Sequence, residues 1–192
     1  MSSLEVIKSA IERIILDPRY QDVLSVVKGA RNGAVYGSKV RFPHALVMIF
    51  LFRSGTFRHK LSLVLRATKT HAMNLATFAT IYKLTVMMLK KFGPTPDKEG
   101  PYDTFLAGLV GGYVVFGRRS PRTGKIPRST SRSSQISHYA WPAFASLSWA
   151  MVMYLFRWHP EDLQSSLRGS MNYIYVDSNH WDSLRNFIWH NK

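Results

Sequence analysis

The segment KGARNGAVYGSKVRFPHALVMIFLF, Lys28 to Phe52, contains the pattern that decides the fold of this chain. Gly29, Gly33 and Gly37 are spaced four residues apart, so a helix of 3.6 residues per turn places all three on one face. Each interior glycine costs a helix roughly 1 kcal/mol of propensity relative to alanine. Three glycines in register are therefore typical of a face that a second helix approaches closely, which is most useful inside a membrane.

The composition excludes several classes of protein. The chain has 192 residues, a net charge of +15 and no cysteine. Without cysteine there is no disulfide framework, thiolate metal site or cysteine nucleophile. Such a positive charge is typical either of a nucleic-acid binder or of a membrane protein with basic linkers. The length predicts one unit, a single integral membrane domain of residues 1–192.

Four apolar segments are candidates to cross a membrane: residues 29–52, 70–89, 104–117 and 139–156. The second carries one charge, Lys83, and the last two carry none. The segment 104–117 also holds a second pair of small residues at the same spacing. This pair is Gly108 and Gly112, and we expect it to pack against the first three glycines.

The distribution of charge supports these four segments. If each crosses once, the linkers 53–69 and 118–132 lie on the same side, and both are purely basic. The N-terminus, the linker 90–103 and the C-terminus lie on the other side, and each sums to zero net charge. This asymmetry is the one described by the positive-inside rule. It favours a membrane protein over a soluble nucleic-acid binder.

Three cations interrupt the first segment. With Gly29 at 0 degrees and about 100 degrees per residue, the glycines span 0 to 80 degrees, Arg41 lies near 120, Arg31 near 200 and Lys39 near 280. These cations either line a polar, water-filled surface for an anionic solute, or the span begins later and they reach lipid head groups. Pro43 is expected to kink or break this helix.

The stretch 118–134 is rich in Arg, Ser, Pro and Gly, which predicts a flexible basic loop. The loop binds anionic head groups, contributes to membrane targeting, or only determines topology. Its cations are Arg118, Arg119, Arg122, Lys125, Arg128 and Arg132.

Both termini are predicted to be amphipathic helices, residues 1–16 and 178–190. We expect the first to pack on the rest of the protein rather than to lie free on a membrane surface, and the second to lie in the interface. Asp177 and His180 have the spacing of two metal ligands, but no further ligand accompanies them. No catalytic motif occurs, so no catalytic residue, metal or cofactor is predicted.

Three blocks resemble one known family, that of peroxisomal membrane protein 4: Lys28 to Met48, Phe105 to Gly117 and Ser170 to Trp181. This family is part of the superfamily of mitochondrial inner-membrane protein translocase channels. The resemblance implies a multi-pass protein of the peroxisomal membrane without known enzymatic activity, whose glycine stripe is a helix-packing signature. It also implies the peroxisomal membrane-protein import receptor as a partner. The lipid bilayer and a homo- or hetero-oligomer are the other expected partners, and the sequence does not set the oligomeric state. The family pattern has a further hydrophobic helix after Gly117, where this chain has the basic stretch.

The expected fold is therefore all-α: a polytopic helical membrane protein with about four membrane segments packed through glycine stripes, plus amphipathic terminal helices. Two functions remain open. The chain contributes to a small solute pore or translocase-like membrane complex, or it is a structural or assembly protein that docks partner helices through its glycine motifs.

Overall fold

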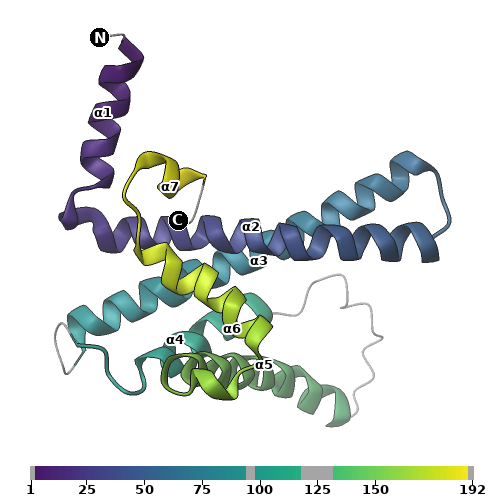
Figure 1. The fold of residues 1–192 in the computed structure, drawn as a ribbon. Helices are drawn as coiled ribbons and strands as arrows, with labels where there is room; N and C mark the ends of the chain where they lie inside the picture. Colours follow the sequence, from purple (N-terminus) through teal and green to yellow (C-terminus); the bar gives the residue numbers. More distant parts are fainter. Residues whose placement is uncertain (1–2, 94–97, 118–131, 190–192) are drawn as a thin grey trace. The chain divides into compact units, whose positions relative to one another are not determined.

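Every element in the described part of the chain is a helix or a helical turn (Figure 1). The computed structural model describes residues 3–93, 98–117 and 132–189, apart from the side chains of residues 3, 4 and 132–139. The predicted all-α class is confirmed. The seven α-helices are α1 (Ser3–Ile15), α2 (Gln21–Phe52), α3 (Phe57–Phe92), α4 (Asp103–Gly112), α5 (Arg132–Trp158), α6 (Ser165–Met171) and α7 (Leu184–Ile188).

Short helical turns continue or join these helices. They are η1 (Pro18–Tyr20), η2 (Tyr113–Gly117), η3 (Pro160–Asp162), η4 (Asn172–Val176) and η5 (Asp177–Asn179). The chain divides into two compact units. Unit 1 contains residues 1–80 and 169–192, and unit 2 contains residues 81–168, so the boundary passes through α3.

In unit 1, α2 and the first part of α3 form a helical hairpin around the turn at residues 53–56 (Figure 1). Gly55 has φ 134°, a conformation that residues with a side chain rarely adopt. The expected break at Pro43 is wrong, since α2 continues through it to Phe52. A proline removes one hydrogen bond of a helix, and the adjoining turns can hold the remaining ones in an apolar environment. The stretch 57–69, predicted as a linker, is the beginning of α3.

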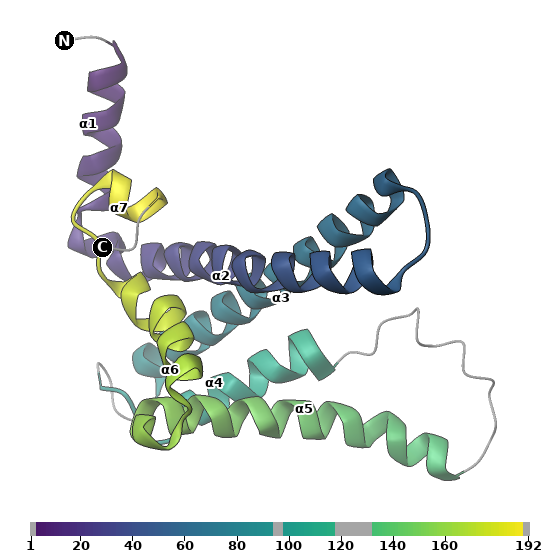
Figure 2. The same ribbon diagram turned by 45° about the vertical axis from the view of Figure 1, so that its right-hand side comes forward.

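In unit 2, α4 and α5 lie side by side (Figures 1 and 2). Apart from Met153, the buried residues of α5 are small, such as Ala145 and Ala150, whereas Phe144, Leu147 and Met151 are 66%, 55% and 52% exposed. A soluble helix buries its large apolar residues and exposes polar ones. The reverse arrangement is typical of helices that pack through small residues and present large apolar side chains to lipid.

Among the helices of the described residues, only α3 is both long and apolar enough to cross a membrane by length and composition. Just 28% of its most apolar window is buried within the protein. The helix at residues 103–117 is apolar but shorter. The crossing of α2, α4 and α5 therefore stays a prediction.

Two predicted boundaries are corrected by the structure. The C-terminal helix is not residues 178–190: the backbone is extended at His180 and at Ser183, so α7 begins only at Leu184. There the Ser183 hydroxyl accepts a hydrogen bond from the backbone N–H of Asn186 at 3.3 Å, which caps the helix. At the predicted basic loop, residues 132–134 already belong to α5, and residues 118–131 lie outside the description.

Candidate functional site

The C-terminal segment, residues 172–188, lies along the polar face of α2 within unit 1 (Figure 1). Three side chains of α2 donate hydrogen bonds to backbone carbonyl groups of this segment. The pairs are Lys28 Nζ with the carbonyl of His180, Arg31 Nε with that of Ile188 at 3.0 Å, and Asn32 Nδ2 with that of Tyr173 at 2.8 Å. Because this segment consists of short helices and turns, many of its carbonyl groups lack helical partners. Side chains of α2 satisfy three of them.

Lys28 is fully buried, with a relative exposure of 0%. Its ammonium lies 5.7 Å from the centroid of the Trp181 ring, within the range of a cation–π contact. Lys28 precedes the expected membrane segment. Burial and the positive charge of Arg31 lower the pKa of Lys28, and the negative charges of Asp177 and Asp182 oppose this shift only in part. A buried ammonium held by a carbonyl and an aromatic face identifies Lys28 as the anchor of the C-terminal segment.

Lys39 is exposed on α2, in contrast to Lys28. Its ammonium lies 5.8 Å from the centroid of the Tyr173 ring, which in turn lies 6.3 Å from the ring of Tyr36. Pro43 cannot donate the helical hydrogen bond to the carbonyl of Lys39. One turn of α2 therefore combines a cation with a backbone acceptor that lacks its helical donor.

The other two predicted anion-facing residues have partners within the protein. Arg31 donates to the Asn32 side chain at 2.6 Å in addition to its bond with the C-terminal segment. Arg41 Nη1 lies 3.2 Å from His44 Nδ1, one turn further along α2. The three cations thus do not form one cluster. Arg31 and Lys39 contact the C-terminal segment at different residues, through the Ile188 carbonyl and the Tyr173 ring, whereas Arg41 contacts His44 of its own helix.

The predicted helix-packing glycines lie against the backbone of neighbouring helices. A Cβ built at Gly33 would be 2.8 Å from the Leu75 carbonyl oxygen, and one at Gly37 would be 2.9 Å from Ala72 Cα. Gly29 is buried as well. Gly33 and Gly37 therefore both face α3, which leaves no room for a second helix on this side of α2.

The second pair packs in the same way on α5. A Cβ at Gly108 would lie 2.8 Å from the carbonyl oxygen of Trp149, and one at Gly112 would lie 3.0 Å from that of Ala145. We expected this pair to pack against the glycines of α2. That expectation is wrong, because Gly33 and Gly37 lie against α3 whereas Gly108 and Gly112 lie against α5, each within its own unit.

The remaining predicted site residues belong to the basic stretch. Arg118, Arg119, Arg122, Lys125 and Arg128 lie outside the described residues, and Arg132 begins α5 without a described side chain. Among the described residues, His159, Glu161 and Asp162 bring three potential metal-ligand atoms within 4.8 Å of one another. All three are exposed residues of one turn, and His159 Nδ1 lies 3.6 Å from Glu161 Oε1. We assign no metal role to them.

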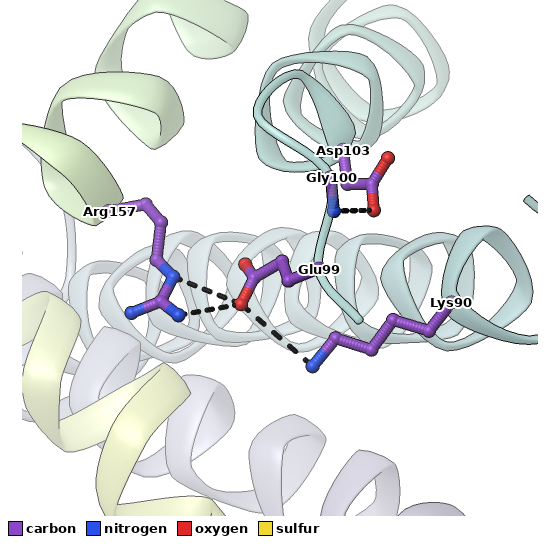
Figure 3. Close-up of polar contacts among 5 residues, drawn as sticks. All are labelled: Lys90, Glu99, Gly100, Asp103 and Arg157. Carbon is purple, nitrogen blue, oxygen red and sulfur yellow. Dashed lines mark hydrogen bonds and ion pairs between the residues drawn. The ribbon is translucent and has the colours of Figure 1, made fainter. Parts of the chain in front are cut away.

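An ion cluster in unit 2 joins the ends of three helices and was not predicted from the sequence (Figure 3). Glu99 Oε2 accepts hydrogen bonds from Arg157 Nε and Nη2, at 3.0 and 2.8 Å, and lies 3.9 Å from Lys90 Nζ. Next to it, the Asp103 carboxylate accepts from the backbone N–H of Gly100 at 2.7 Å. These contacts bring the last turns of α3 and α5 close to the first turn of α4.

Replacing Glu99 with glutamine is expected to lower the free energy of unfolding by about 0.5–1 kcal/mol, because the Arg157 side chain is half-exposed. Thermal unfolding of the full chain in detergent measures this change. The matched variant Glu161→Gln removes a carboxylate that is 67% exposed, and it should leave the unfolding temperature unchanged. Equal effects of the two variants would contradict the role of the cluster.

Sequence reasoning missed Lys28 and Asn32 on the face of α2, and Tyr173 of η4 as their neighbour in the C-terminal segment. A signal was present, since positions 28, 32 and 39 fall on one side of a helix at intervals of four and seven residues. The acceptors had no such signal, because they are backbone carbonyl groups and every residue has one.

Comparison with known proteins identifies relatives over the whole chain. The profile of the Tim17/Tim22/Tim23/Pmp24 family matches residues 19–136. A protein named "Peroxisomal membrane protein 4" from Bos taurus is 38% identical, and the alignment covers 98% of this chain and 95% of that protein. The protein of the same name from Homo sapiens is 37% identical, with the same coverage of both chains. No solved structure matches the chain.

Proposed function

The chain belongs to the Tim17/Tim22/Tim23/Pmp24 family and is a protein of the peroxisomal membrane, and from this premise we propose that it contributes to a small pore for anionic solutes. In this proposal the chain is a non-enzymatic membrane subunit. Four segments cross the bilayer, at residues 29–52, 70–89, 104–117 and 139–156.

Two features support this topology. The basic stretches 53–69 and 118–132 fall on one side of the membrane, as the positive-inside rule requires. On the other side, Glu99 joins Arg157, directly after the last segment, to Lys90, directly after the second. The two segments between Lys90 and Arg157, residues 104–117 and 139–156, make an even number of crossings. Lys90 and Arg157 would therefore lie on the same side of the membrane, as their shared contact with Glu99 requires.

The position of Lys39 in α2 carries the pore proposal. A crossing needs about 20 residues, and α2 has 32, from Gln21 to Phe52. Every segment of 20 residues within α2 contains position 39, so α2 cannot cross without this cation. Facing lipid, a lysine at such a depth costs about 2.5–3.5 kcal/mol even on the lenient insertion scale.

Lys39 lies off the glycine face, which α3 fills, and its side chain is exposed in the structure. A water-lined pathway next to α2 would solvate the ammonium and remove the cost of placing it in lipid. The positive charge of this ammonium would attract anions and repel cations, and the low dielectric constant of its surroundings would strengthen both effects. The proposed solute is therefore a small anion.

Efflux of a small anionic dye from liposomes that contain the full chain tests this proposal. We expect efflux above that of empty liposomes, and Lys39→Gln should lower it about tenfold, which corresponds to ~1.4 kcal/mol of lost attraction. The control Lys8→Gln removes the same formal charge from an exposed side chain of α1, outside α2, and should not alter efflux. Alkaline carbonate extraction establishes that each variant is inserted. Inserted protein without efflux, or equal effects of the two variants, argues against the pore.

An assembly role is the second candidate function. Gly33 and Gly108 already contact helices of their own chain, so docking through these glycines would require a partner helix to displace α3 or α5. The outer apolar face of α5, with Phe144, Leu147 and Met151, is the surface that favours an assembly role instead. If this role holds, replacing Leu147 with glutamate shifts the size of the complex on native gels. The assembly proposal also includes the peroxisomal membrane-protein import receptor, which would bind the basic stretch 118–132.

A further inference from the structure

The apolar side of α1 is not covered by other parts of the described protein, contrary to the expectation that this helix packs on the rest of the chain. Val6, Ile7, Ile11 and Ile14 are 52%, 56%, 40% and 57% exposed. They occupy an arc of about 140 degrees of the helix, taking about 100 degrees per residue. Exposed isoleucines at successive helical turns form one continuous apolar surface.

The opposite side of α1 is polar and nearly balanced in charge. Lys8 and Glu12 form an ion pair of 4.0 Å one turn apart, Glu5 lies beside Glu12 on the helix wheel, and Arg13 lies at the border with Val6. A balanced face gives no electrostatic reason to bind an acidic or a basic partner. Among the exposed side chains described for α1, those of the apolar side therefore offer the driving force for association.

The end of α1 is held beside the place where α2 begins its expected membrane segment. The Trp181 indole donates a hydrogen bond to the carbonyl of Ile15 at 2.9 Å, and the Lys28 ammonium lies over the same ring. Ile15 itself is 7% exposed, unlike the apolar residues before it. Trp181 thus ties the last turn of α1 to the first turns of α2, and tryptophan is enriched at the level of membrane head groups.

We propose that α1 is an interfacial helix that lies on the bilayer, with Ile7, Ile11 and Ile14 inserted among the lipids and Lys8 and Glu12 in water. The occupant of the apolar surface is lipid, because the chain is a membrane protein and the helix is tied next to a membrane segment. The helix thereby anchors the N-terminus at the side on which the C-terminal segment lies. This inference does not depend on the pore.

Single cysteines in the full chain test the proposal without background, since the natural sequence has none. The apolar-side variants are Ile7→Cys, Ile11→Cys and Ile14→Cys, and the matched polar-side variants are Lys8→Cys and Glu12→Cys. Each is labelled with an environment-sensitive fluorophore and reconstituted into neutral phosphatidylcholine liposomes. Quenching is measured with spin-labelled lipids and, separately, with aqueous iodide.

We expect lipid quenching to be several-fold stronger at positions 7, 11 and 14, and iodide quenching to be stronger at 8 and 12. Equal quenching on both sides of the helix would overturn the proposal. Protection of the apolar positions from both quenchers would also overturn it, because protein would then cover that face. Carbonate extraction confirms insertion of every labelled variant, so a variant that fails to insert is replaced by a neighbour on the same face.

Discussion

Replacing Gly33 with alanine is expected to lower the free energy of unfolding by about 1–3 kcal/mol, the usual range for overpacking. The new Cβ would lie 2.8 Å from the carbonyl oxygen of Leu75 and 2.9 Å from its carbonyl carbon. Both atoms are backbone, so relief requires α2 and α3 to separate rather than one side chain to rotate. The gain of roughly 1 kcal/mol in helix propensity offsets only part of this cost. Leucine at the same position should have a larger effect.

Gly169→Ala is the matched control, since beyond the adjoining backbone of α6 no atom lies within 4 Å of a Cβ built at Gly169. That variant should keep or slightly raise the unfolding temperature of the full chain in detergent, because alanine restricts the unfolded chain. Limited proteolysis at the α2–α3 turn gives a second readout, and cleavage should be faster in Gly33→Ala alone. An unfolding temperature as high as that of the control would show that α2 and α3 do not pack closely at this point.

Replacing Lys28 with methionine is expected to release the C-terminal segment from α2. Methionine fills a similar volume, but it cannot donate to the carbonyl of His180 or make a cation–π contact with Trp181. An unsatisfied buried carbonyl costs about 1–3 kcal/mol, and the lost cation–π contact adds about 1–2 kcal/mol at a buried site. The combined loss is a large share of the free energy that holds the C-terminal segment on α2, because only a few hydrogen bonds and ring contacts are described between them.

Protease protection of the C-terminus in intact proteoliposomes, together with tryptophan fluorescence, measures the release. We expect faster digestion after residue 170 and a red-shifted emission in Lys28→Met. The variant Lys39→Met is the matched control, because Lys39 is an exposed lysine of the same helix. Its ammonium lies over the ring of Tyr173, and Lys39 is not buried beneath the C-terminal segment as Lys28 is. A C-terminus that stays protected in Lys28→Met would refute the anchoring role of this residue.

Much of the secondary structure was predictable because it depends on local pattern. The glycines of α2 and α4, the apolar runs and the end of α1 before Pro18 all follow from helical periodicity and from the conformational limits of proline. Pro43 misled the prediction, since a proline after several helical turns does not have to end a helix. The start of α3 at Phe57 was missed because its basic residues resemble a linker.

The candidate site was predictable only in part. Arg31, Lys39 and Arg41 stood out as cations in an apolar segment, whereas Lys28 lay at its edge and was not selected. What separates Lys28 from Lys39 is burial beneath the C-terminal segment, about 150 residues away in the chain. No local pattern reports such a contact, because it depends on where a distant segment returns.

By itself, the sequence determined that the chain is helical, that it is a membrane protein of this family, and that two helices have a glycine face for close approach. These properties depend on residue type and spacing alone. The tertiary structure decided which helix fills each glycine face: α3 for Gly33 and Gly37, and α5 for Gly108 and Gly112. A glycine face accepts any helix of suitable shape, so its partner is chosen by how the chain connects and packs as a whole. The tertiary structure also decided which cations of α2 the C-terminal segment covers. Their partners are backbone carbonyl groups, which every residue has, so no residue type in the sequence indicates them.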